Sequence, residues 1–161
     1  MIDREQLIRA FAFNVAGAKQ QTAGLTHKQS LLQLPFRGNC MNWVLGHLVE
    51  NRSAILVNLG QSPIMTEAEA RRYGYGSEPV TCEGEDVLRM EDLLGRFERA
   101  QGLIADALRK ATPELLAQEV HFIGRTMSMA ERLFFQYYHE TYHLGQLEQL
   151  RQLAGTNDKV V

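Results

Sequence analysis

The sequence SMAERLFFQYYHETYHLGQLEQLRQLA, residues 128–154, decides the fold class. Apolar side chains recur in it every three or four residues, the spacing of one face of an α-helix, over a length that β-strands rarely reach. Ser128 and Glu131 form a Ser-x-x-Glu capping box at its start, and Gly155 follows its end as a stop signal. This stretch therefore predicts one long α-helix.

Three further segments have the same periodicity, at about residues 4–20, 40–59 and 86–111. No segment shows the convincing alternation with period two that is typical of a half-buried strand. Asp3 is the expected N-cap of the first helix and Asn39 that of the second. The sequence thus predicts an all-α fold, a four-helix bundle, and its length fits a single domain over residues 1–161.

The connection between the second and third helices, residues 60–85, is longer than a simple bundle needs. Fully extended, such a segment spans about 85 Å, whereas a twenty-residue helix is about 30 Å long. It is therefore long enough for a crossover that leaves the second and third helices parallel. Thr112 and Pro113 predict a short extra helix before the last one.

The composition is that of an ordinary globular protein, with 45% hydrophobic and 22% charged residues. The net charge of −2 argues against a nucleic-acid binder. No basic run or amphipathic helix rich in lysine and arginine suggests an anionic membrane as partner. Two cysteines, Cys40 and Cys82, are too few for a disulfide framework and suit a reducing compartment. Because charged residues begin at Asp3 and no apolar run could span a bilayer, we expect a cytoplasmic protein.

Two of the five histidines lie four residues apart, in the string His-Glu-Thr-Tyr-His at residues 139–143. Residues four apart share a helix face, so His139 and His143 can bind one cation. His-Glu-x-x-His is also the zinc-protease motif, but Gln146 and Gln149 stand where its longer form has glycine and histidine. A third metal ligand must therefore come from upstream.

His47, in the middle of the second predicted helix, is the candidate third ligand. A single histidine among bulky apolar residues is more often a core residue with a hydrogen-bond partner. Gln136 and Gln146, however, extend the stripe of His139 and His143 into a polar seam, and buried polar groups need partners. Either a metal shared with His47 satisfies these imidazoles, or the stripe is exposed to solvent.

The chain resembles the DinB-like (damage-inducible B, YfiT-like) family of metalloenzymes. The resemblance rests on Trp-x-x-x-His ending at His47 and on His-x-x-x-His-x-Gly-Gln at residues 139–146, and it covers essentially the whole chain. It implies a four-helix bundle with a crossover, a homodimer, and a divalent metal bound by His47, His139 and His143. Relatives include transferases that use low-molecular-weight thiols such as bacillithiol, and mycothiol-dependent isomerases.

Three neutral imidazoles leave coordination positions open, which is typical of catalytic metal sites and suits Zn, Ni, Fe or Mn. A metal there lowers the pKa of bound water to about 7 or deprotonates a low-molecular-weight thiol. We therefore predict a metal-dependent thiol S-transferase or hydrolase that acts on a small molecule. The alternative is a non-catalytic stress-response or binding bundle whose metal is absent or structural.

Each ligating imidazole is expected to use its other ring nitrogen in a hydrogen bond. Glu50, Asn51, Gln136 and Gln146 are the candidate partners, because they lie about one helical turn from the histidines. Glu140 is a candidate catalytic base or, alternatively, a surface or interhelical carboxylate.

Two other groups of residues lie between the predicted helices. His27 and His121 are expected to be solvated there. Arg37, Arg71 and Arg72 fall in long connections, where a guanidinium group can bind the carboxylates of an anionic thiol.

Overall fold

Helix α7 (Met129–Leu153) is the longest helix of the computed structural model, which describes residues 3–156. Its N-cap is Ser128, whose hydroxyl accepts a hydrogen bond from the Glu131 N–H. In return the Glu131 carboxylate accepts hydrogen bonds from the N–H and hydroxyl groups of Ser128. The predicted capping box is thus confirmed, and it fixes where the helix begins.

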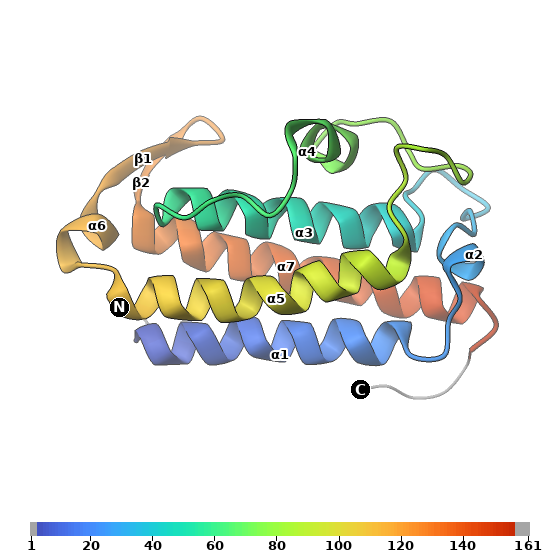
Figure 1. Ribbon diagram of the computed structural model, residues 1–161, viewed down its shortest axis with the longest axis horizontal. Coiled ribbons are helices and arrows are strands. Elements are labelled where there is room, and N and C mark those ends of the chain that lie inside the picture. The colour runs from blue at the N-terminus through green and yellow to red at the C-terminus, as the bar shows by residue number, and fades with distance from the viewer. Residues whose placement is uncertain (1–2, 157–161) are drawn as a thin grey trace.

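Three other long helices pack with α7 into a bundle: α1 (Arg4–Thr22), α3 (Met41–Asn58) and α5 (Met90–Lys110). Helices α1 and α3 each contact both α5 and α7. The colours in Figure 1 show that α3 and α5 run in one direction and α1 and α7 in the other. The predicted all-α four-helix bundle with a crossover is therefore confirmed.

Helix ends differ from the predictions by a few residues. Helix α5 begins at Met90 rather than near Asp86, because a turn precedes it and the Asp86 carboxylate forms an ion pair with Arg72 at 2.9 Å. Cys40, not Asn39, is the N-cap of α3, and its side chain makes no capping hydrogen bond. These ends depend on contacts between distant segments, so local sequence signals miss them.

Three short helices occupy the connections. Helix α2 (His27–Ser30) lies between α1 and α3, and α4 (Glu67–Tyr73) lies in the crossover, over α3 in Figure 1. Helix α6 (Pro113–Ala117) is the predicted extra helix, with Thr112 as its N-cap. Within the described residues, none of the helices is long and apolar enough to cross a membrane.

A two-stranded antiparallel hairpin between α6 and α7 was not predicted. Its strands are β1 (Glu119–Phe122) and β2 (Arg125–Ser128), and Glu119 pairs with Ser128 at its open end. Ile123 and Gly124 form the turn, with φ angles of 50° and 69°. Strands of only four residues contain too few alternations for the period of two to be recognised.

The buried apolar residues form two clusters, one toward each end of the bundle. Each of the four long helices contributes to both clusters. Between the clusters lies a layer of buried polar side chains, which we call the polar layer. It contains Asn14 of α1, Arg52 of α3, and Gln136 and Glu140 of α7. The core is therefore shared by the whole bundle.

Candidate metal centre

The structure brings together the three histidines that the sequence singles out. His47 projects from α3, and His139 and His143 project from α7. Each ring offers one nitrogen as a ligand atom, and these three nitrogens all lie within 4.8 Å of one another. The Nε2 atoms of His139 and His143 are 3.1 Å apart. The nitrogen ligands of a tetrahedral zinc ion, with bonds of about 2.0–2.1 Å, lie about 3.4 Å apart. The spacing therefore suits a shared metal ion.

Hydrogen bonds fix the tautomers of two of these rings. His47 Nδ1 lies 2.9 Å from the carbonyl oxygen of Tyr73, which can only accept, so Nδ1 carries the hydrogen. His143 Nδ1 likewise donates to Gln146 Oε1 at 2.7 Å. In both rings Nε2 keeps its lone pair, which is the form that a metal ligand requires.

The third ring, His139, is held by packing. It stacks on Phe135 with ring centroids 6.2 Å apart and an interplanar angle of 20°. Its Nδ1 is buried and has no hydrogen-bond partner among the described residues. A donor set of three clustered imidazoles, two of them in the ligating tautomer, fits a divalent metal such as zinc.

Burial keeps all three imidazoles neutral at pH 7. Burial, together with repulsion from the neighbouring imidazoles, lowers the pKa of His47 and of His139 to about 4, while the hydrogen bond to the Tyr73 carbonyl opposes this shift at His47. Burial also lowers the pKa of His143, against the opposing effect of its hydrogen bond to Gln146. Because a metal ligand must be deprotonated, these pKa shifts favour metal binding.

Gly46 explains how Tyr73 reaches His47. A Cβ atom on Gly46 would overlap the ring of Tyr73, so only glycine allows α4 to approach α3 this closely. The Tyr73 ring is fully buried, and its hydroxyl donates to Asn42 Oδ1 at 3.0 Å and accepts from the Leu88 N–H at 2.8 Å. The end of α4 is thereby fixed with its carbonyl oxygen on His47.

A cavity of about 420 Å³ opens beside the three histidines. Trp43 and Tyr142 form part of its wall, and Trp43 stacks on His47 with ring centroids 4.9 Å apart. Arg37 is the one cationic side chain among the described residues that line the cavity, and no carboxylate lines it. The cavity therefore suits a small molecule that carries negative charge.

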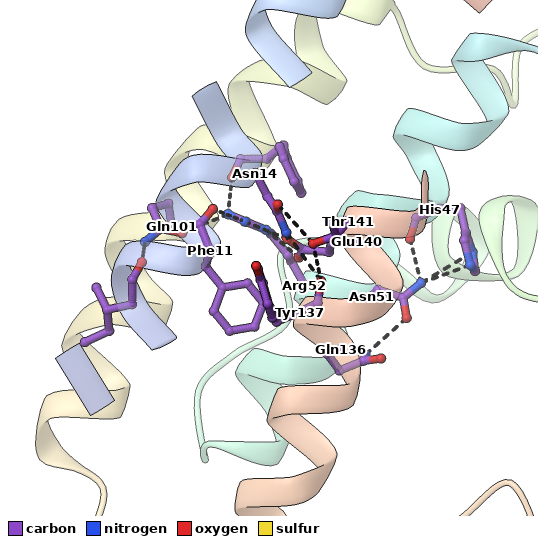
Figure 2. A network of polar contacts seen from close by, with 12 residues as sticks. Phe11, Asn14, His47, Asn51, Arg52, Gln101, Gln136, Tyr137, Glu140 and Thr141 are labelled. Carbon is purple, nitrogen blue, oxygen red and sulfur yellow. Dashed lines mark hydrogen bonds and ion pairs between the residues drawn. The ribbon is translucent and has the colours of Figure 1, made fainter. Parts of the chain in front are cut away.

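The four candidate hydrogen-bonding partners occupy different places. Gln146 contacts His143 as described, and the Asn51 amide nitrogen lies 3.1 Å from His47 Nε2. Gln136 contacts Asn51 rather than an imidazole, with Nε2 donating to Oδ1 at 3.1 Å (Figure 2). Glu50 is half-buried and makes no hydrogen bond to the imidazoles within the described part of the chain; burial raises its pKa.

Glu140 does not reach the imidazoles. Its side chain is fully buried, and its carboxylate accepts a hydrogen bond from Arg52 Nε at 2.8 Å (Figure 2), so it is an interhelical carboxylate. The expectation that His27 is solvated is wrong: His27 is buried, and its Nδ1 accepts from the Met90 N–H at 3.1 Å. His121 is exposed on β1, as expected.

Of the three candidate arginines, only Arg37 lines the cavity. Arg71 and Arg72 lie in α4 rather than in a loop, and they form ion pairs with Glu67 and Asp86. The sequence-based prediction missed the Tyr73 carbonyl, because any residue type supplies such an acceptor. Gly46, one residue before His47 within a helix, is the signal that a neighbour approaches there.

Comparison with known proteins agrees with this fold. The family model described as DinB superfamily matches residues 20–147. No curated protein matches the chain. Among solved structures, the chain is similar to the mycothiol-dependent maleylpyruvate isomerase, with 16% identity and a TM-score of 0.67 over 91% of this chain and 61% of that chain.

A mutant of the same isomerase, with one histidine replaced by alanine, gives 15% identity and a TM-score of 0.67 over the same shares of the two chains. The chain thus spans about three fifths of the length of these solved structures. At such low identity the likeness shows the fold alone.

Proposed function

The chain belongs to the DinB superfamily, and from this membership and its three-histidine centre we propose that it is a metal-dependent enzyme acting on a small molecule. The observation that carries the proposal is the convergence of His47, His139 and His143 beside a cavity. Within the described residues, the metal-type cluster contains these three ligands and no fourth. A site with three protein ligands leaves a position for substrate, which favours catalysis over a structural metal.

When bound, Zn, Ni, Fe or Mn would supply Lewis acidity that lowers the pKa of a water or thiol ligand. The protein's own residues orient the imidazole ligands and favour a substrate that carries an anionic group. The Tyr73 carbonyl and Gln146 hold two imidazoles in the ligating tautomer. Trp43 and Tyr142 supply aromatic surface to the cavity wall, and Arg37 offers a positive charge for an anionic group.

We favour thiol S-transfer over hydrolysis. The cavity has one cation and no carboxylate among its described lining residues, so its charge stabilises a thiolate. A structurally similar protein is named as mycothiol-dependent, which is a dependence on a low-molecular-weight thiol. Such a thiol would attack an electrophilic substrate through sulfur, forming the S–C bond while the substrate's leaving group departs.

Metal analysis tests the proposal. Purified protein reconstituted with zinc is expected to retain about one ion per chain, and His139→Ala is expected to lose it. His121→Ala is the matched control, because this histidine is exposed on β1 and lies outside the cluster. Wild-type protein that retains no zinc, or a His139→Ala variant that binds it as tightly as wild type, would overturn the proposal.

Cobalt substitution tests the choice of thiol chemistry. In protein loaded with Co²⁺, a small thiol such as cysteine is expected to produce a sulfur-to-cobalt charge-transfer band, because the thiolate takes the open position. Arg37→Ala is expected to weaken binding of a thiol that carries carboxylates and to leave binding of 2-mercaptoethanol unchanged. If no thiol gives the band, the hydrolase is the better hypothesis.

We also propose that the protein is a cytoplasmic homodimer, as the family resemblance and the composition imply. Helix α7 exposes Phe134, Tyr138 and Tyr142 at intervals of four residues, so they form one aromatic stripe. Exposed aromatic surfaces of this kind are typical of protein interfaces. Light scattering coupled to gel filtration measures the mass in solution, and a monomer would contradict the dimer.

A further inference from the structure

A bidentate ion pair joins Arg52 of α3 to Glu140 of α7 in the polar layer. Both side chains are fully buried. Arg52 Nε lies 2.8 Å from Glu140 Oε1, and Arg52 Nη2 lies 3.0 Å from Oε2. Asn14 of α1 also donates to Oε2, at 3.2 Å. Neither member of the pair lines the cavity, so the pair has no direct contact with a ligand there.

The remaining N–H groups of Arg52 reach the other two long helices (Figure 2). Nη1 donates to the carbonyl oxygen of Phe97 at 3.1 Å and to Gln101 Oε1 at 3.2 Å, both on α5. Nη2 donates to the carbonyl oxygen of Phe11 on α1 at 2.9 Å. All five donors of the guanidinium group are therefore satisfied. One side chain ties α3 to α1, α5 and α7 at a single level of the bundle.

The ion pair is next to the metal centre along both helices. Glu140 lies between the two histidines of α7, and Arg52 directly follows Asn51, whose amide contacts His47. A shift of α7 by one residue would move it about 1.5 Å and turn its side chains by about 100°. Such a shift would break the ion pair and separate the α7 imidazoles from His47 at the same time.

The apolar clusters on either side cannot fix this alignment as strictly. Hydrophobic cores tolerate repacking and lose uniqueness of structure before they lose stability. A slide that separated Arg52 from Glu140, in contrast, would leave two buried charges without partners, which is strongly unfavourable. Replacing such a pair by apolar residues of similar size, however, often leaves stability unchanged. Alignment is thus the property that specifically needs the charges.

We propose that Arg52 and Glu140 are positioning residues, which set the register of α7 against α3 and so bring the three imidazoles to a common point. The pair does this through helix placement and not through contact with a ligand. Metal sites tolerate displacements of only about 0.5 Å. The inference rests on the proposed metal-dependent function, since that function is what makes the alignment of the imidazoles matter.

The test replaces both charges at once, with Arg52→Met and Glu140→Leu in one protein. Leu133→Ala is the control, because Leu133 is a fully buried residue of the same helix that carries no charge. Circular dichroism measures folding, competition with a chromophoric chelator measures zinc affinity, and the visible spectrum of bound Co²⁺ reports coordination geometry. We expect the double variant to fold but to bind zinc at least tenfold more weakly, with an altered Co²⁺ spectrum.

The control is expected to lose stability yet to keep the wild-type zinc affinity and Co²⁺ spectrum. A folded double variant with both properties unchanged would overturn the positioning role. If the double variant does not fold, Arg52→Gln combined with Glu140→Gln replaces it, since this pair removes both charges, leaves neither without its partner and keeps polar side chains. The same loss of zinc affinity is expected there, and wild-type affinity would again overturn the role.

A wild-type protein that binds no metal would contradict the proposed function. The alignment of the α7 imidazoles with His47 could still be measured. Proton NMR of the imidazoles in metal-free protein then decides it. The wild type is expected to show nuclear Overhauser contacts from the ring of His47 to the rings of His139 and His143, whose centroids lie 5.2 and 5.1 Å away across the two helices. The double variant is expected to lose these contacts, and unchanged contacts would overturn the positioning role.

Discussion

Gly46 is a single residue whose missing side chain shapes the metal centre, which makes it a sensitive site for substitution. Gly46→Ala is expected to lower the free energy of unfolding by about 1–3 kcal/mol, because the new methyl group overlaps the buried Tyr73 ring. It is also expected to weaken metal binding, since Tyr73 holds His47. Urea unfolding and zinc titration measure the two effects.

Gly95 in α5 is the matched control for Gly46. Apart from the adjacent backbone of α5 itself, no atom of the described residues lies within 4 Å of a Cβ atom placed there. Gly95→Ala is therefore expected to raise the free energy of unfolding by about 0.5–1 kcal/mol, the usual gain of alanine over glycine inside a helix. A loss of stability in both variants would contradict the special role of Gly46.

Acid is expected to destabilise the metal-free protein through its buried imidazoles. The pKa of His47 is about 4 in the folded protein, against about 6.5 for an unperturbed histidine. Between these pH values the unfolded chain binds more protons, so the free energy of unfolding falls as the pH falls from about 6.5 toward 4. For His47 alone the loss is expected to approach about 3 kcal/mol.

Urea unfolding at pH 7 and at pH 4.5 measures this loss. His47→Gln is the comparison, because it removes the imidazole and keeps a polar side chain. The wild type is expected to lose more stability than His47→Gln over this interval. Equal losses in the two proteins would show that His47 does not take up a proton on unfolding.

At the scale of helices and strands, the sequence predicts what local patterns encode. Each long helix buries an apolar face, so its periodicity is visible, and end signals such as Asp3 and Ser128 confirm its start. His139 and His143 are paired by their spacing within one helix. The ion pair of Arg52 with Glu140 was not predicted, because it joins residues 88 positions apart on different helices.

Helix capping gives a prediction for α7. Ser128→Ala removes both hydrogen bonds that its hydroxyl makes in the capping box, and is expected to lower the free energy of unfolding by about 1 kcal/mol. Thr112→Ala removes a similar cap from α6, a helix with no buried residues. For Thr112→Ala we expect the free energy of unfolding to fall by less than about 0.5 kcal/mol, because little packing depends on α6. Equal losses in urea unfolding would contradict this ranking.

At the scale of the whole molecule, the shared core predicts cooperative unfolding. All four long helices contribute to both apolar clusters. A helix that leaves one cluster therefore also disrupts the other cluster. Fluorescence of Trp43, the only tryptophan, reports on one cluster, whereas far-ultraviolet circular dichroism reports on all helices. The two urea transitions are expected to coincide. Separate transitions would contradict the prediction of a single domain.

The buried guanidinium of Arg52 also bears on biosynthesis. As the chain leaves the ribosome, α1, α3 and α5 emerge before Glu140 does. A compact three-helix intermediate would enclose a positive charge that nothing neutralises, so the nascent chain is disfavoured from collapsing early. When α7 arrives it delivers the counter-charge and two imidazoles together. Completion of the core and completion of the metal-binding set thus both depend on one step, the docking of α7.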